Sequence, residues 1–147
     1  MPNAFQLDAR LDADTVFLFD WPLSRVLLMN DAQYPWCILV PREILSDGAN
    51  VTELYELEQV KRVQLDKESV LLAQTMMRLF GGQKMNIAAL GNVVSQLHVH
   101  HVVRYESDVS WPAPIWGKHP VKAYEAAELS TRTALLVNAL STAFDEA

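Results

Sequence analysis

Hydrophobic residues first recur along the chain in three short runs that are typical of β-strands. The runs cover 15–19, 25–29 and 37–40 and are rich in Val, Ile, Leu and Phe. Turn residues separate the first two runs, and Pro41 ends the third. Because the connections are short, we expect three antiparallel neighbours in one sheet.

A longer segment with a different period follows, from about residue 52 to residue 80. Its apolar residues recur at steps of three or four, or multiples of these, which predicts one buried face of an amphipathic helix. These residues are Leu54, Leu57, Val60, Val63, Val70, Met77 and Phe80. The pair Gly81-Gly82 supplies a stop signal. The pattern then predicts two more strands, over 85–90 and 96–105, and a second helix over 121–144.

This order of elements indicates an α+β fold. We expect an antiparallel five-stranded sheet, covered on one side by one long central helix and a C-terminal helix. No repeat, low-complexity segment or linker divides the sequence. Residues 1–147 are therefore predicted to form a single domain.

Charge and cysteine content restrict the classes of partner. The formal net charge of −6 argues against non-specific binding of nucleic acid or anionic membranes, which needs a basic surface. A small anionic ligand remains compatible, since an acidic protein can contain a local cationic pocket. Cys37 is the only cysteine, the N-terminus lacks the basic residues of a signal peptide, and no apolar run reaches the ~20 residues of a membrane span. We expect a cytoplasmic protein.

The candidate chemistry lies in the fifth predicted strand. Three of the four histidines fall between positions 98 and 101. Strand alternation places Gln96, His98, His100 and Arg104 on one face and His101 on the other. Side chains two residues apart have Cα atoms ~6.5–7 Å apart. Two imidazoles at that spacing can flank one phosphate, one attacking phosphorus while the other donates to an oxygen.

Histidine suits this chemistry because neutral imidazole is a good nucleophile near pH 7 and forms a reactive phosphoramidate. One ring nitrogen must carry the proton while the other stays free. A hydrogen bond from Nδ1–H to a backbone carbonyl would fix that tautomer.

The histidine segment resembles the His-φ-His-φ-His-φ-φ motif of the histidine triad (HIT) family of nucleotide hydrolases and transferases, where φ is apolar. In that alignment Gln96 takes the first position, His98 the second and His100 the third. Three flanking segments agree with the family as well. They are Gly91-Asn92-Val93-Val94 (family Gly-Gln-x-Val), Leu27-Leu28-Met29-Asn30 (a strand ending in Asn) and Pro35 to Pro41 (family Gly-His-x-φ-φ-φ-Pro).

The resemblance implies a HIT-like fold and hydrolysis or transfer at a nucleotide α-phosphate. His98 would be the nucleophile, with His100 and Gln96 supporting the developing charge. Asn30 and Asn92 would contact the nucleotide. The family is typically a homodimer with a shared sheet, and its substrates include dinucleoside polyphosphates and nucleoside phosphoramidates. No cofactor is required, although a polyphosphate substrate can bring Mg²⁺ with it.

Three departures from the family pattern concern the site. Gln96 replaces the first histidine, Trp36 stands where many members have an auxiliary histidine, and Val93 stands where others have Ser or Thr near the leaving group. The first two affect substrate preference. The third affects assistance to the leaving group.

Several residues near the motif have two interpretations. Trp116, in a loop with two tryptophans and two prolines, would either cover the nucleotide site or anchor the loop to the core or a dimer interface. Arg104 would bind phosphate or form a salt bridge. We expect His101 to pack or to support the site indirectly, and His119 to be solvated.

Two other functions remain open. A non-catalytic nucleotide-binding module would keep the site while the Gln96 change abolished turnover. A metal site would use His98 and His100 as two ligands but needs others, such as His119 or Asp108. The nucleotide hydrolase or transferase that we predict first has no metal-binding residues.

Overall fold

The computed structural model describes residues 4–145, so the first three and last two residues of the predicted domain lie outside it. The fold is α+β, as predicted, with one five-stranded antiparallel sheet in the order β1-β2-β3-β5-β4. The strands are β1 (Thr15–Asp20), β2 (Ser24–Met29), β3 (Trp36–Pro41), β4 (Lys84–Ala88) and β5 (Val99–Arg104). The predicted strands therefore all exist, and the first three differ from their predicted bounds by one residue at most.

The largest difference is at β5, which was predicted to begin at residue 96. Regular pairing starts only at Val99, where the chain aligns with Leu39 of β3. Residues 91–98 form an irregular loop before the strand. Alternation holds inside the strand: Val99 and His101 face the main core, while His100 faces the opposite side.

The long helix α2 (Gln59–Phe80) begins later than predicted, because Leu54–Glu56 forms a separate 3-10 turn. It ends as predicted at Gly81, whose φ of 59° is a left-handed conformation that glycine adopts without strain.

The prediction of the buried face of α2 was correct only in part, since Met77 and Phe80 pack against the main core. Val60, Val63 and Val70 are exposed, and the buried face instead carries Leu65, Leu72, Met76 and, among them, Glu68. The Glu68 carboxylate accepts hydrogen bonds from two backbone N–H groups at the turn between β1 and β2, at 2.9 and 3.0 Å. This buried acid interrupts the apolar pattern on the face that packs against the sheet.

Two other helices complete the fold. The C-terminal helix α3 (Ala126–Leu140) is shorter than the predicted 121–144. A short helix, α1 (Ala9–Asp14), was not predicted; the Asp8 side chain caps its first turn by accepting from the Arg10 N–H. No helix in the part of the chain that the structure describes is long and apolar enough to cross a membrane.

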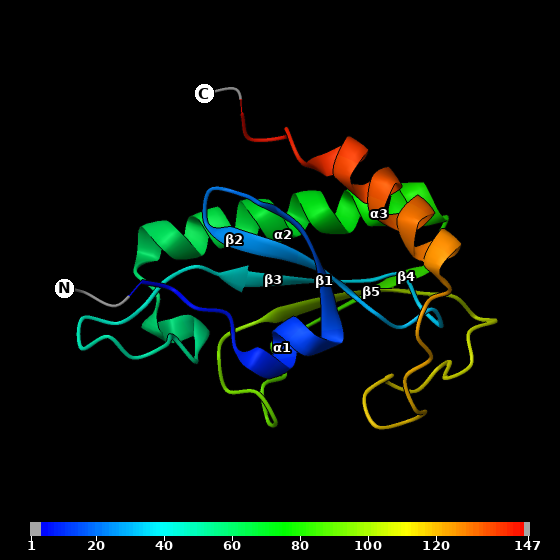
Figure 1. Ribbon diagram of the computed structural model, residues 1–147, viewed down its shortest axis with the longest axis horizontal. Coiled ribbons are helices and arrows are strands. Elements are labelled where there is room, and N and C mark those ends of the chain that lie inside the picture. The colour runs from blue at the N-terminus through cyan, green and yellow to red at the C-terminus, as the bar shows by residue number, and fades with distance from the viewer. Residues whose placement is uncertain (1–3, 146–147) are drawn as a thin grey trace.

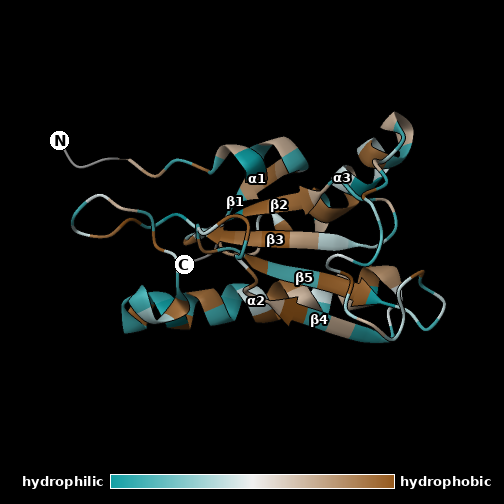
Figure 2. Cartoon of the chain, turned by 90° about the horizontal axis from the view of Figure 1, so that it is seen from below, coloured by the Kyte–Doolittle hydropathy of each residue, from teal (hydrophilic) through white to brown (hydrophobic). Residues whose placement is uncertain are grey.

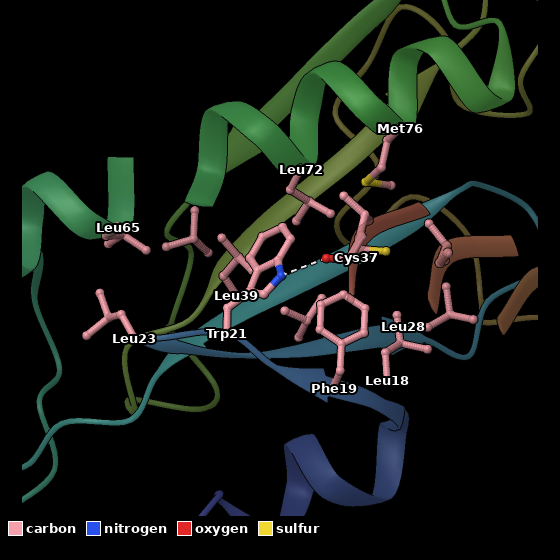
Figure 3. Close-up of a cluster of buried hydrophobic side chains, with 14 of the residues drawn as sticks. Leu18, Phe19, Trp21, Leu23, Leu28, Cys37, Leu39, Leu65, Leu72 and Met76 are labelled. Carbon is pink, nitrogen blue, oxygen red and sulfur yellow. Dashed lines mark hydrogen bonds between the residues drawn. The ribbon is translucent and has the colours of Figure 1, made fainter. Parts of the chain in front are cut away.

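The main core lies between the sheet, α2 and α3, and Figure 3 shows part of it. Its buried side chains include Val26, Leu28, Cys37, Leu39, Leu72, Met76, Val103, Leu136 and Leu140. The Trp21 indole N–H donates to the Leu140 carbonyl over 2.9 Å and ties the end of α3 to this core.

The other face of the sheet is also covered, which corrects the prediction of a sheet covered on one side. A second cluster combines strand residues such as Leu27, Ile38 and Val102 with Leu11 of α1 and Ile115 of the loop before α3. Figure 1 shows α1 and α2 on opposite sides of the sheet, and Figure 2 shows α1 lying in front of its β1 and β2 end. The histidine site lies on this second face.

Candidate active site

A cavity of about 430 Å³ opens on this second face of the sheet, where the 91–98 loop enters β5. Its volume is within the range of small-molecule sites. Residues from α1, β2, β3, β5, the segment 90–98 and the loop that contains Trp116 line it. They are Leu11, Asp14, Met29, Trp36, Ile38, Leu90, Asn92, Val93, Val94, His98, His100, Trp116 and Gly117.

His98 is held in one tautomer by the backbone. Its Nδ1 lies 2.7 Å from the Gln96 carbonyl oxygen, and a carbonyl only accepts, so Nδ1 carries the proton. In the neutral form of this ring, which lines the cavity, Nε2 is therefore the nitrogen without a proton. This is the bond that the sequence argument required. The loop that makes it is tight at Gly91, where an added Cβ would lie 2.8 Å from the Val94 carbonyl oxygen.

His100 has the opposite tautomer. The Trp36 indole N–H donates to His100 Nδ1 over 3.0 Å, so the proton of the neutral ring is on Nε2. Burial, followed by the neighbouring His98, lowers the pKa of His100 to about 4, against a backbone hydrogen bond to Leu90 that raises it. His100 is therefore neutral near pH 7.

The two rings meet as predicted, although only His100 belongs to the regular strand. Their centroids are 4.8 Å apart with an edge-to-face angle of 73°. Both line the same cavity. The pair combines one imidazole whose Nε2 has no proton, that of His98, with one whose Nε2 carries the proton, that of His100.

His101 faces α2, as its strand position predicted. Its Nδ1–H donates to the Val99 carbonyl at 3.1 Å, and its Nε2 accepts from the Ser69 hydroxyl at 2.7 Å. Burial lowers its pKa to about 4, partly opposed by the Val99 bond. This histidine is a neutral, fully bonded core residue.

The prediction that the Gln96 side chain supports developing charge does not fit its position. Its Oε1 accepts from the Asp8 N–H and its Nε2 donates to the Gln6 carbonyl, both at 2.9 Å. The side chain is buried against the N-terminal segment and does not line the cavity. Gln96 reaches His98 only through its backbone carbonyl.

The two predicted asparagine contacts have different positions. Asn92 lines the cavity. Asn30 does not, because its Oδ1 accepts from the Tyr124 N–H at 3.0 Å and fixes the approach to α3. The structure therefore places Asn30 outside the candidate site.

Trp116 forms one cavity wall and also packs on neighbouring rings. Its centroid is 5.3 Å from that of His100 and 6.3 Å from that of Trp36. Its indole nitrogen is buried and has no hydrogen-bond partner among residues 4–145. Trp116 thus packs against the aromatic residues of β3 and β5 and forms this wall of the cavity.

The loop that carries Trp116 is anchored at its start by a buried ion pair. Arg104 donates to Asp108 at 2.8 and 3.1 Å and to the Asn86 carboxamide at 2.8 Å. Arg104 is therefore the salt-bridged residue of its two interpretations. His119 is exposed, as predicted, with one bond to the Val109 carbonyl.

Sequence reasoning missed Leu11 and Asp14 of α1, and Met29 and Ile38 of the sheet, in the cavity wall. The six residues of α1 are too few to show a helical period, and the Asp8 cap is its only signal. The lining contains no Lys or Arg, so the cationic pocket that we considered is not found among these residues.

A second hollow and the grouping of possible metal ligands also bear on the function. A hollow of about 540 Å³ between residues 4–9 and 44–50 has no histidine in its lining. Within residues 4–145, no three His, Cys, Asp or Glu side chains are grouped to hold a metal ion. Among these residues, no third side chain of this kind joins His98 and His100 to complete a metal site.

Comparison with known proteins agrees with the motif. The HIT domain family model matches residues 10–107. A histidine triad protein from Marinobacter aquaeolei VT8 is 48% identical, with 94% of this chain and 97% of that chain covered and a TM-score of 0.88. Histidine triad proteins from Bradyrhizobium japonicum and Sinorhizobium meliloti 1021 are each 38% identical. They cover 94% and 92% of this chain and 99% and 97% of their own, with TM-scores of 0.88 and 0.86. No curated protein is matched.

Proposed function

Since the chain belongs to the HIT domain family, we propose that it hydrolyses or transfers a nucleotide at its α-phosphate through a covalent bond to His98. Membership supports a HIT-type, nucleotide-binding function. The observation that carries the catalytic proposal is the His98 ring, whose Nδ1–H is held by the Gln96 carbonyl so that Nε2 stays free, and which lines the cavity with its centroid 4.8 Å from that of His100.

In the first step, His98 Nε2 attacks phosphorus, and the bond between phosphorus and the leaving group breaks. The leaving amine or phosphate takes the electron pair, and an amine also takes a proton from solvent. The imidazolium that forms keeps its Nδ1–H on the Gln96 carbonyl, which stabilises the positive charge. In the second step, water attacks phosphorus and loses a proton to solvent, the P–N bond breaks with its electron pair returning to Nε2, and His98 is again neutral with its proton on Nδ1.

His100 serves the same steps without exchanging a proton. Its Nε2–H would exchange its bond to the Leu90 backbone for one to a phosphoryl oxygen as negative charge develops there. Leu11, Met29 and Ile38 offer an apolar wall for a base, and Asp14 and Asn92 offer polar groups for a sugar.

The proposal is tested by trapping the covalent adduct. The protein is incubated with an adenosine phosphoramidate or a diadenosine polyphosphate, quenched in base, which preserves phosphorus–nitrogen bonds, and weighed by mass spectrometry. We expect a nucleotidyl adduct and nucleoside monophosphate as product. Neither should form with His98→Ala, whereas the exposed His119→Ala should behave as wild type. An adduct that persists in His98→Ala would refute the assignment of the nucleophile.

A second candidate is nucleotide binding without turnover. Val93 favours it, because an exposed valine at the cavity edge cannot donate a proton to a leaving group. Calorimetry with adenosine monophosphate separates the two candidates. Micromolar binding with no product from either substrate would favour the binding module. The covalent step needs no metal, and Mg²⁺ would enter only with a polyphosphate, so EDTA should leave phosphoramidate turnover unchanged.

We also propose a homodimer formed through β4. This strand is at the edge of the sheet, so its outer backbone groups have no partner strand. Exposed apolar side chains lie on it and on the neighbouring helix, among them Ile87, Val63 and Val70. Analytical ultracentrifugation should give twice the chain mass, and Ile87→Glu should reduce it to the monomer. A monomeric wild type at micromolar concentration would contradict this proposal.

A further inference from the structure

We propose that Trp36 is a positioning residue that fixes which ring nitrogen of His100 carries the proton, so that the donor of this ring is Nε2–H and not Nδ1–H. The role of that N–H in turnover rests on the function proposed above. The positioning itself does not.

The sheet brings the two side chains together. Ile38 of β3 is opposite His100 of β5, and Trp36 is opposite Val102, so Trp36 and His100 share one face on adjacent strands. Both are buried, with 6% of each residue exposed. The indole N–H reaches Nδ1 over 3.0 Å, and the ring centroids are 5.6 Å apart.

The chemistry of each partner leaves only one arrangement. An indole nitrogen can donate but never accept, so Nδ1 of His100 must be the accepting nitrogen. A backbone carbonyl can accept but never donate, so Nδ1 of His98 must be the donating one. Two neighbouring histidines are thus held in opposite tautomers by groups that cannot exchange roles.

Trp36 stands where many family members have an auxiliary histidine, and the two side chains differ in how they can bond His100. A histidine there could donate or accept, and it could itself become charged near neutral pH. Tryptophan can only donate, and it has no charged form near neutral pH. Protonating His100 would place a second N–H against the indole N–H inside a buried cluster, and therefore the same bond that sets the tautomer also opposes the cation.

Few other titratable groups lie near the bond between Trp36 and His100. The titratable residues near His100 are His98 on the same cavity, His101 on its own strand and Asp14 from α1 on the cavity wall. The residues that face it from β3 and β4, Ile38 and Ala88, do not titrate. Trp116 covers the remaining side.

Imidazole ¹⁵N NMR measures the tautomer directly in the wild-type protein. Between pH 5.5 and 8 we expect His100 to carry its proton on Nε2. Trp36→Phe keeps an aromatic ring but removes the donor. In that variant His100 should populate both tautomers and its pKa should rise toward 6.5. The control Trp111→Phe removes another indole N–H, one that does not line the cavity, and should leave the His100 signals unchanged.

Kinetics supplies a second measurement. Loss of one neutral hydrogen bond should lower kcat by about fivefold in Trp36→Phe at pH 7 and leave KM within twofold. The loss should deepen at lower pH, as His100 begins to protonate. Trp36→His should recover part of kcat at pH 8, where its own ring is neutral and can donate.

Two results would overturn the proposal. One is a wild-type His100 with its proton on Nδ1, which needs no variant. The other is a folded Trp36→Phe in which the His100 tautomer and pKa are those of the wild type. If the wild type turns over no nucleotide, the function above fails, while the NMR measurement still decides the role of Trp36.

Discussion

Replacing Gln96 by alanine should loosen the N-terminal segment and weaken substrate binding while sparing the chemical step. The Gln96 amide bonds the backbone of Gln6 and Asp8 at 2.9 Å each. The segment leads directly into α1, whose residues Leu11 and Asp14 line the cavity. In the variant, the Asp8 N–H and the Gln6 carbonyl lose their protein partner.

The size of the effect follows from the two bonds. Each neutral hydrogen bond contributes about 1 kcal/mol net, so the segment should lose about 2 kcal/mol of docking free energy. A change of that size shifts a local opening equilibrium about 30-fold. Because α1 retains the Leu11 contacts and the bond from Arg10 to the Val93 carbonyl, the global unfolding transition should move less.

Hydrogen exchange measures the docking without reference to activity. The Asp8 amide should exchange about 30-fold faster in Gln96→Ala, while amides of β3 and β5 keep their protection. In kinetics, KM should rise severalfold with kcat within twofold. Gln83→Ala is a matched control, since Gln83 also bonds a backbone amide, that of Glu106, but away from the cavity. A collapse of kcat with unchanged Asp8 exchange would show that the side chain acts on the reacting phosphate.

Three further predictions concern stability. The pKa values of His100 and His101 lie at about 4 in the fold, below the ordinary 6.5, because both rings are buried. The unfolded chain therefore binds more protons between these values, so stability is complete above pH 6.5 and falls with decreasing pH. The loss should be about 2 kcal/mol for each ring between pH 7.5 and 5, and urea unfolding at the two pH values checks it. Glu68→Gln replaces a buried carboxylate that accepts two backbone N–H groups and should lower the unfolding free energy by about 2–3 kcal/mol; an unchanged melting temperature would contradict the capping role. Asp108→Asn leaves the buried Arg104 charge without its counter-ion and should destabilise the protein by about 3 kcal/mol in the same assay, with a larger loss than Asp20→Asn on the surface.

The sheet could be predicted from the sequence because the residues that define each strand are neighbours in the chain. Apolar runs with Pro, Asn and Asp between them define each strand and its neighbours. The histidine pair was accessible for the same reason: positions 98 and 100 are close in the chain and rest on a short piece of backbone. The opposite orientation of His101 followed from alternation alone.

What sequence reasoning missed depends on contacts between distant segments. Gln96 bonds residues 88 and 90 positions away, and Asn30 bonds Tyr124, 94 positions away. No local pattern distinguishes these structural bonds from contacts with a ligand. The prediction of the buried face of α2 failed at several positions for a different reason. In the sequence, Glu68 cannot be distinguished from a solvent-facing residue, because its two backbone hydrogen-bond partners are distant in the chain.

The cavity lining has consequences for how substrate arrives. The chain carries a net charge of −6, and neither Lys nor Arg is among the residues that line the cavity. Phosphate would be held by uncharged dipoles, whose attraction is short-ranged, while the distant field of the whole molecule repels anions. Dissolved salt screens only that repulsion. Encounter with an anionic substrate should therefore become faster as ionic strength increases, the reverse of the behaviour of enzymes that capture phosphates with lysine and arginine.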